Sequence, residues 1–154
     1  MKKTALYITL FSAFIFLSSS SENSNCDTKA LKNELTQELK PDFKYDSSNI
    51  NHFTLEAKKQ GTEVKVPIFS GESYRLLFNT AGISTDFEIL IYDKKHDAKN
   101  RKLLYSVKGS ETDKHIFVYE PKHSKTIYID YMLPGTEEKG VTGCIVFLMG
   151  YKVG

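Results

Sequence analysis

Residues 62–92 read TEVKVPIFSGESYRLLFNTAGISTDFEILIY, and the alternation of apolar and polar side chains in this stretch decides the fold. The pattern predicts three strands, at Thr62–Phe69, Ser73–Asn79 and Asp86–Tyr92. Ser70-Gly71-Glu72 predicts a tight reversal between the first two strands, and Ala81-Gly82 interrupts the alternation before the third. We expect these strands to be antiparallel neighbours with one apolar face. Because that face needs a second layer to cover it, the stretch predicts a β-sandwich.

The rest of the chain supplies further strands with turn residues between them. They are expected at His52–Ala57, Lys102–Val107, His115–Tyr119, Lys125–Leu133 and Thr142–Tyr151. The last one is apolar on both faces, which predicts a strand covered on both sides. Pro67 lacks a donor for the ladder and indicates an edge strand or an outward-facing position. The expected fold is mainly β: an antiparallel, jelly-roll-like sandwich of about eight strands.

One short helix is predicted before the sandwich, over Asp27–Lys40. Asp27 suits the N-cap, and Leu31, Leu35 and Leu39 form an apolar stripe at helical spacing. Pro41 ends the helix because proline cannot continue its hydrogen-bond ladder. We expect this helix to cover an edge of the core, with Asp42–Asn51, rich in turn residues, as the connection that follows.

The N-terminus has the three regions of a secretory signal peptide. Met1-Lys2-Lys3 is basic, Ala5 to Leu17 is apolar, and Ser18 to Ser21 offers small residues for cleavage. The apolar run is shorter than the roughly 20 residues that span a bilayer, which disfavours a retained anchor. We therefore expect a signal peptide over residues 1–20, a linker over 21–26 and one domain over 27–154. The expected location is periplasmic or extracellular.

Export changes the charge balance. The formal charge of +2 includes Lys2 and Lys3, so removing them lowers the basic residues from 21 to 19, against 19 acidic ones. A neutral mature chain has no global field that attracts polyanions. We therefore expect no nucleic-acid partner.

The two cysteines, Cys26 and Cys144, lie near opposite ends of the mature chain. An oxidising compartment favours a disulfide between them, which would hold the helix beside the last strand. The alternative is two independent thiols, with Cys144 as a small core residue. Lipid attachment at Cys26 is disfavoured, because Asn23, Ser24 and Asn25 replace the apolar and small residues that a lipoprotein signal requires.

Several stretches resemble a group of small exported bacterial β-sandwich proteins of uncharacterised function, which combine a signal peptide, a short helix and a closing Gly-Cys strand. The stretches are Gly71–Leu76, Phe87–Tyr92, Ile127–Ile129 and Gly143–Lys152. The strand pattern is also similar to bacterial pre-peptidase C-terminal domains, which are jelly-roll-like modules of secreted enzymes. That resemblance implies a sandwich without chemistry of its own.

No catalytic motif is present: the sequence has no G-x-S-x-G, H-E-x-x-H, C-x-x-C or glycine-rich phosphate loop. The histidines, at positions 52, 96, 115 and 123, have no metal-ligand spacing, and we expect them on the surface. Two weaker metal hypotheses are a site of His96 with Asp93 and Asp97, and calcium at Asp86 and Asp93. We expect no cofactor and no metal.

The most polar stretch, Asp93–Arg101, is expected to be a long exposed hairpin loop. Its Lys94, Lys95, His96 and Arg101 are candidates for contacting phosphates or an acidic partner, although charges at a hairpin tip also serve simply to keep strand edges apart. Tyr74, Tyr105, Tyr128 and Tyr131 lie on strand rows, where tyrosine ordinarily packs; stacking on sugars needs an exposed aromatic surface.

These patterns predict an exported, non-catalytic binding module whose ligand is an envelope protein or a glycan. The alternative is a structural accessory subunit of an envelope complex, docked through the helix or an edge strand. A small hydrolase built from scattered residues is the third hypothesis. The identity of the partner and the oligomeric state stay open at this point.

Overall fold

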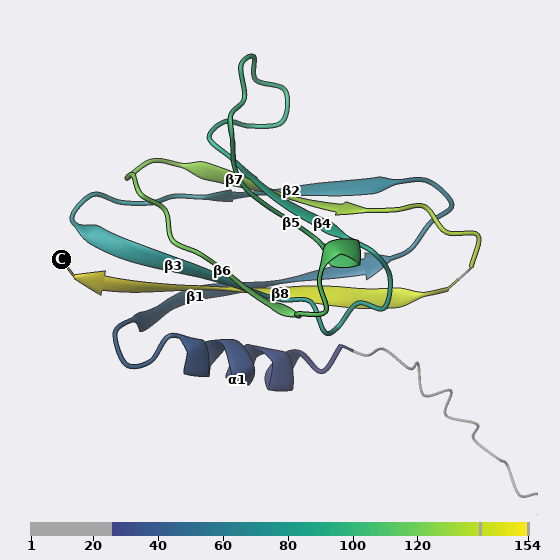
Figure 1. Ribbon diagram of the computed structural model, residues 1–154, viewed down its shortest axis with the longest axis horizontal. Helices are drawn as coiled ribbons and strands as arrows, with labels where there is room; N and C mark the ends of the chain where they lie inside the picture. The colour runs from purple at the N-terminus through teal and green to yellow at the C-terminus, as the bar shows by residue number, and fades with distance from the viewer. Residues whose placement is uncertain (1–25, 139, 154) are drawn as a thin grey trace, which may run out of the picture.

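The computed structural model describes residues 26–138 and 140–153 and shows two stacked sheets with one helix beneath them (Figure 1). The helix α1 spans Thr28–Glu38. The strands are β1 (Lys44–Thr54), β2 (Gln60–Val66), β3 (Glu72–Asn79), β4 (Glu88–Tyr92), β5 (Leu103–Lys108), β6 (Ile116–Tyr119), β7 (Ile127–Leu133) and β8 (Thr142–Val153). The expected mainly β fold with one short helix is therefore confirmed.

The eight strands form a jelly roll. Sheet A has the order β1-β8-β3-β6 and sheet B the order β2-β7-β4-β5, and all pairs are antiparallel. Only the hairpin from β4 to β5 stays within one sheet, while every other connection between consecutive strands crosses to the opposite sheet. This alternation is the topology of a double-sheet jelly roll.

The expectation that the three strands of residues 62–92 are neighbours is wrong. β2 and β4 lie in sheet B with β7 between them, whereas β3 lies in sheet A. The apolar rows of all three strands nevertheless face the same interior, because Val66, Phe78 and Ile91 belong to one core cluster. A strand's alternation reports which side is buried, but it does not report which strand lies beside it.

The prediction of a connection over Asp42–Asn51 followed by a strand at His52–Ala57 is also wrong, because a single strand, β1, begins at Lys44 and ends at Thr54. β1 pairs with β8 from Lys44 opposite Tyr151 to Thr54 opposite Thr142, with an irregularity between Tyr45 and Ser47. β1 is an edge strand with mostly exposed side chains, so it shows no apolar alternation. Its strand conformation comes from the hydrogen-bond ladder that β8 offers.

β8 is covered on both faces, as predicted. Ile145, Phe147 and Met149 pack in the core between the sheets. On the other face, Val146 and Leu148 pack in a second cluster with Leu35 of α1. The helix therefore closes the outer face of sheet A (Figure 1).

The helix has the ends that the sequence indicated, within two residues. The Asp27 side chain accepts a hydrogen bond from the Ala30 N–H at 3.0 Å and so satisfies one of the free amides of the first turn. Leu31, Leu35 and Leu39 are all buried, as the stripe predicted.

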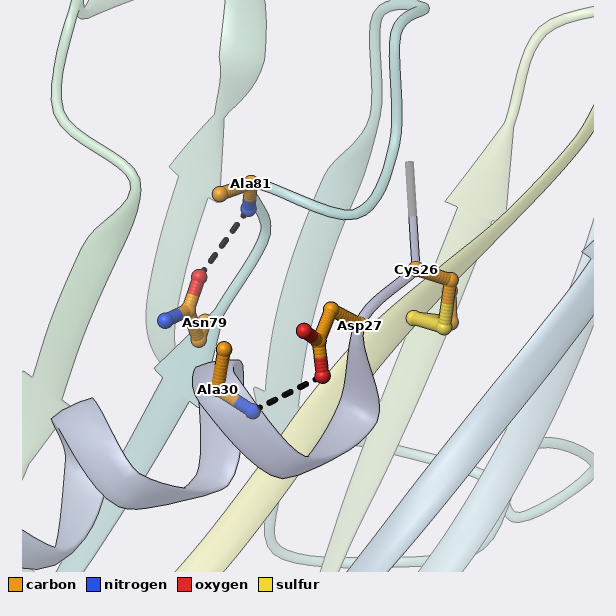
Figure 2. The surroundings of a disulfide bond; sticks show 6 residues. Cys26, Asp27, Ala30, Asn79 and Ala81 are labelled. Atoms are coloured by element: carbon orange, nitrogen blue, oxygen red, sulfur yellow. Dashed lines mark hydrogen bonds between the residues drawn. A yellow bond between two sulfur atoms is a disulfide. The ribbon is translucent and has the colours of Figure 1, made fainter. Parts of the chain in front are cut away.

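Cys26 and Cys144 form a disulfide that ties the start of α1 to β8 (Figure 2). Their Cα atoms are 5.6 Å apart, and 118 positions separate them in the sequence. Gly82 lies against this bond, since a Cβ at that position would be 2.7 Å from the sulfur of Cys144. The disulfide hypothesis is confirmed over that of two independent thiols. The bond also occupies the sulfur that lipid attachment would need.

The predicted signal peptide and the linker up to Asn25 lie outside the described residues. Among the residues that are described, no helix has the length and apolarity to cross a membrane. Pro67 lies just beyond the end of β2, which is an edge strand of sheet B, as expected.

Candidate functional site

The loop between β4 and β5 stands above sheet B, on the side of the molecule opposite to α1 (Figure 1). Its base is closed by two hydrogen bonds: the Asp93 N–H donates to the Lys102 carbonyl at 3.1 Å, and the Lys102 N–H donates to Asp93 Oδ1 at 2.7 Å. The Lys102 amide holds the pKa of Asp93 below its ordinary value, and the nearby charge of Lys125 adds to this effect. The expected exposed hairpin loop is confirmed and has a defined base.

Arg101 anchors this loop to the sheet. Its guanidinium forms a two-point ion pair with Asp130, at 2.7 and 2.9 Å, and a further contact with Glu63 at 3.0 Å. It lies over the ring of Tyr92, 3.6 Å from the centroid, and it donates to the Lys94 carbonyl at 2.8 Å. The hydrogen bonds to Asp130 raise the pKa of Arg101. A ligand that contacts the Arg101 guanidinium must therefore compete with Asp130 and Glu63, which already accept hydrogen bonds from it.

The other three candidate residues of the loop have different surroundings. The Lys94 ammonium donates to the carbonyls of Lys99 and Asn100 and so braces the loop tip. Lys95 pairs with Asp97 at 3.1 Å, and both side chains are exposed. His96 is exposed and lines a hollow between the loop and the sheet.

The carboxylates considered for metals have partners within the protein. Asp93 lies against Lys102 and Lys125, and Asp97 lies against Lys95. Asp86 accepts hydrogen bonds from the amides of Phe87 and Ser110. In residues 26–138 and 140–153, no three His, Cys, Asp or Glu side chains gather in a group that could hold a metal ion.

The outer face of sheet B carries three neighbouring hollows. Beside the loop lies a hollow of about 410 Å³, lined by Gly61, Thr62, Glu63, His96, Asp130 and Met132. A hollow of about 180 Å³ shares Met132 with it, and a third of about 310 Å³ shares Glu88 and Lys108 with the second. We call these three neighbouring hollows together the sheet B groove. Their lining residues come from all four strands of the sheet, from β2 at one edge to β5 at the other.

The side chains along the sheet B groove combine charges of both signs with apolar surface. Glu88 lies 3.8 Å from Lys59, and Glu63 is paired with Arg101, so the carboxylates have nearby cations. Leu90 and Met132 add partly exposed apolar surface between them. Such a lining can both hydrogen-bond to a polar ligand and cover an apolar part of it.

Two tyrosines lie on this same outer face. Tyr92 on β4 and Tyr128 on β7 are directly opposite each other, and both are partly exposed. Of the tyrosines expected to pack, Tyr74 and Tyr131 are buried, whereas Tyr105 and Tyr128 are only partly so. Tyr92 was not among the residues predicted to form a site, although its position one residue after the buried Ile91 places it on the outer face.

The four histidines lie on the surface, as expected. His123 lines a separate hollow near β5 and β6. No protein-family model matches this chain, and a search of curated proteins finds no significant match.

Proposed function

We propose that this protein is an exported, non-catalytic binding module that holds its ligand in the sheet B groove. The observation that carries the proposal is the difference between the two outer faces: α1 covers sheet A, whereas sheet B is open and hollowed across its width. The disulfide between Cys26 and Cys144 is compatible with export to an oxidising compartment.

A glycan is the ligand class that this groove favours. Sugars present hydroxyl groups around their rings and apolar C–H surface on their faces. Carboxylates with neighbouring cations, such as Glu63 and Glu88, can accept and orient hydroxyl donors, while Leu90 and Met132 offer apolar contacts. An extended chain of sugars also suits three hollows that follow one another across the sheet.

The accessory-subunit alternative draws on exposed apolar side chains near the helix. Tyr45 and Ile50 on β1 are 46% and 38% exposed, and Val118 on β6 is 44% exposed. β1 and β6, however, are opposite edges of sheet A, and Lys32 of the helix lies over the Tyr45 ring. Single apolar residues at separate edges are ordinary for a protein surface, so this alternative has less support than the groove.

The test is photo-crosslinking in the native cell. A photoreactive side chain at the exposed position Ser106, which lines the groove opposite Leu90, is compared with one at Asn33, on the exposed face of α1. We expect Ser106 adducts that mass spectrometry identifies as carbohydrate and no such adducts from Asn33. A single recurrent protein at Asn33 with nothing at Ser106 would reverse the order of the two proposals.

A binding measurement with purified protein completes the test. Ser106→Arg introduces bulk and charge into the groove, whereas Asn33→Arg makes the corresponding change on the exposed face of α1. We expect Ser106→Arg alone to remove binding to a glycan array. Equal glycan binding by both variants would rule out the groove as the site.

A further inference from the structure

A fourth hollow opens at the side of the sandwich, where β5 ends sheet B and β6 ends sheet A. The rings of Tyr105 and Tyr119 link these two edge strands, with centroids 5.3 Å apart. The hollow has a volume of about 270 Å³ and is bordered by the β6–β7 loop. We call it the edge cleft; it meets the sheet B groove only at Leu103.

The inner wall of the edge cleft is apolar. Leu104 and Tyr119 are partly buried at the margin of the main core, and Ile127 is 1% exposed within it. Leu103, at the mouth, is 47% exposed. A ligand with an apolar portion would remove this surface from water and gain the corresponding hydrophobic stabilisation.

The rim of the edge cleft is cationic. Lys102, Lys122 and Lys125 line it, together with His123 and one carboxylate, Glu120. Glu120 is already paired with Arg75 at 2.7 Å.

The lysines of this rim differ in their partners. Lys125 lies 3.8 Å from Asp93. Neither Lys102 nor Lys122 forms an ion pair with any residue in the described part of the chain. The rim therefore has positive charge that the protein itself does not neutralise, although the mature chain as a whole is expected to be neutral.

We propose that the edge cleft binds a phosphate group carried on an apolar chain. The phosphate would lie against Lys102, Lys122 and Lys125, and the apolar chain would lie on Tyr119 and Leu104. Several ammonium groups around one mouth suit a doubly charged phosphate, because each can donate charge-assisted hydrogen bonds to it. The small volume suits a single headgroup or a short chain. This site and its ligand are independent of the glycan proposed for the sheet B groove.

The test follows the Leu104 and Ile127 methyl signals by NMR while hexyl phosphate, inorganic phosphate or hexanol is added to the oxidised protein. We expect hexyl phosphate to shift these signals at a lower concentration than inorganic phosphate or hexanol does. Lys122→Gln/Lys125→Gln should weaken hexyl phosphate binding about tenfold. The matched variant Lys94→Gln/Lys95→Gln removes the same charge from the neighbouring loop and should change binding by less than about twofold.

Vesicles of phosphatidylcholine with and without phosphatidic acid then separate the two sources of such a ligand. If the wild-type protein sediments with vesicles that contain phosphatidic acid and the Lys122→Gln/Lys125→Gln variant does not, the ligand is a membrane lipid. Binding of hexyl phosphate without vesicle binding would identify a soluble ligand of the same chemistry. The proposal is overturned if hexyl phosphate binds no better than inorganic phosphate, or if both double variants weaken its binding equally.

Discussion

At the scale of single residues, Arg101 illustrates how one side chain organises a surface. It comes from the most polar stretch of the chain, yet its side chain is only 13% exposed because it reaches back to Asp130, whose side chain is 8% exposed. The two charges are largely removed from water. They stabilise each other only because the guanidinium and the carboxylate form a short, bidentate ion pair. The loop that carries His96 is thereby held at one end of the sheet B groove.

We expect Arg101→Ala to lower the free energy of unfolding by about 3 kcal/mol, because it leaves the Asp130 carboxylate without its main partner. Urea unfolding followed by circular dichroism measures this change. Lys95→Ala is the control, because its ion pair with Asp97 is exposed and should contribute less than about 0.5 kcal/mol. Equal effects of the two substitutions would show that Arg101 contributes no more than a surface charge.

Asp93 gives a prediction about pH. Its pKa in the folded protein is lowered, chiefly by the Lys102 amide, so the charged carboxylate is favoured in the folded state. A lowered folded-state pKa stabilises the protein above the unfolded pKa of about 3.9, and the stabilisation is lost as the pH falls through the folded value. We therefore expect the difference in melting temperature between the wild type and Asp93→Asn to be largest near neutral pH and to shrink below about pH 4. A difference that stays constant over this range would contradict the assignment.

At the scale of elements, α1 and β8 form one unit. The helix packs on the outer face of β8 through Leu31, Leu35 and Leu39, and the disulfide joins the two where the helix begins. β8 contributes to both hydrophobic clusters, so the attachment of the helix and the packing of the sandwich depend on the same strand.

We expect Cys26→Ser to destabilise the protein by about 4–5 kcal/mol, since the crosslink closes a loop of more than a hundred residues in the unfolded chain. Guanidinium unfolding of the oxidised wild type and of the variant measures the difference. Reductant should lower the stability of the wild type to that of Cys26→Ser and leave the variant unchanged. Mass spectrometry provides the independent check, because the oxidised protein is lighter than the reduced one by two hydrogen atoms.

At the scale of the whole molecule, the jelly roll has one closed outer face and one open outer face. The outer face of sheet A is closed by α1, from the start of the described chain, which packs on β8, the last strand. Within residues 26–138 and 140–153, no helix covers the outer face of sheet B, over which the loop that Arg101 anchors stands (Figure 1). Both proposed binding sites involve sheet B or its β5 edge.

This arrangement predicts a pattern of amide hydrogen exchange. β3, β4, β7 and β8 have a hydrogen-bonded strand on each side, whereas β1, β2, β5 and β6 are edges in which about half of the amides face away from the ladder. We expect the four inner strands to exchange most slowly when the protein is followed by mass spectrometry. Uniform protection across inner and edge strands would contradict the sheet order.

Strand positions with one buried face were predictable because their alternation is a local property. β3, β7 and β8 were found within a few residues of their true ends. Only the end of β1, His52–Thr54, was predicted, as part of the strand expected at His52–Ala57, because the preceding Asp46-Ser47-Ser48-Asn49 segment is exposed at an edge and has turn-forming chemistry. The sheet B groove was not predictable, because its lining comes from β2, β4, β5 and β7 and from a loop, and no local pattern marks residues that meet only after folding.

The sequence by itself determined the mainly β class, the capped helix with its leucine stripe, the burial of β8 on both faces and the single possible pairing of Cys26 with Cys144. The tertiary structure decided which strands are neighbours, that Arg101 is held by Asp130, and which sheet keeps an open face. The physical reason is the distance along the chain over which each interaction acts. Periodicity, capping and turn chemistry act within a few residues, whereas strand order and the pairing of distant charges depend on contacts between segments far apart in the chain.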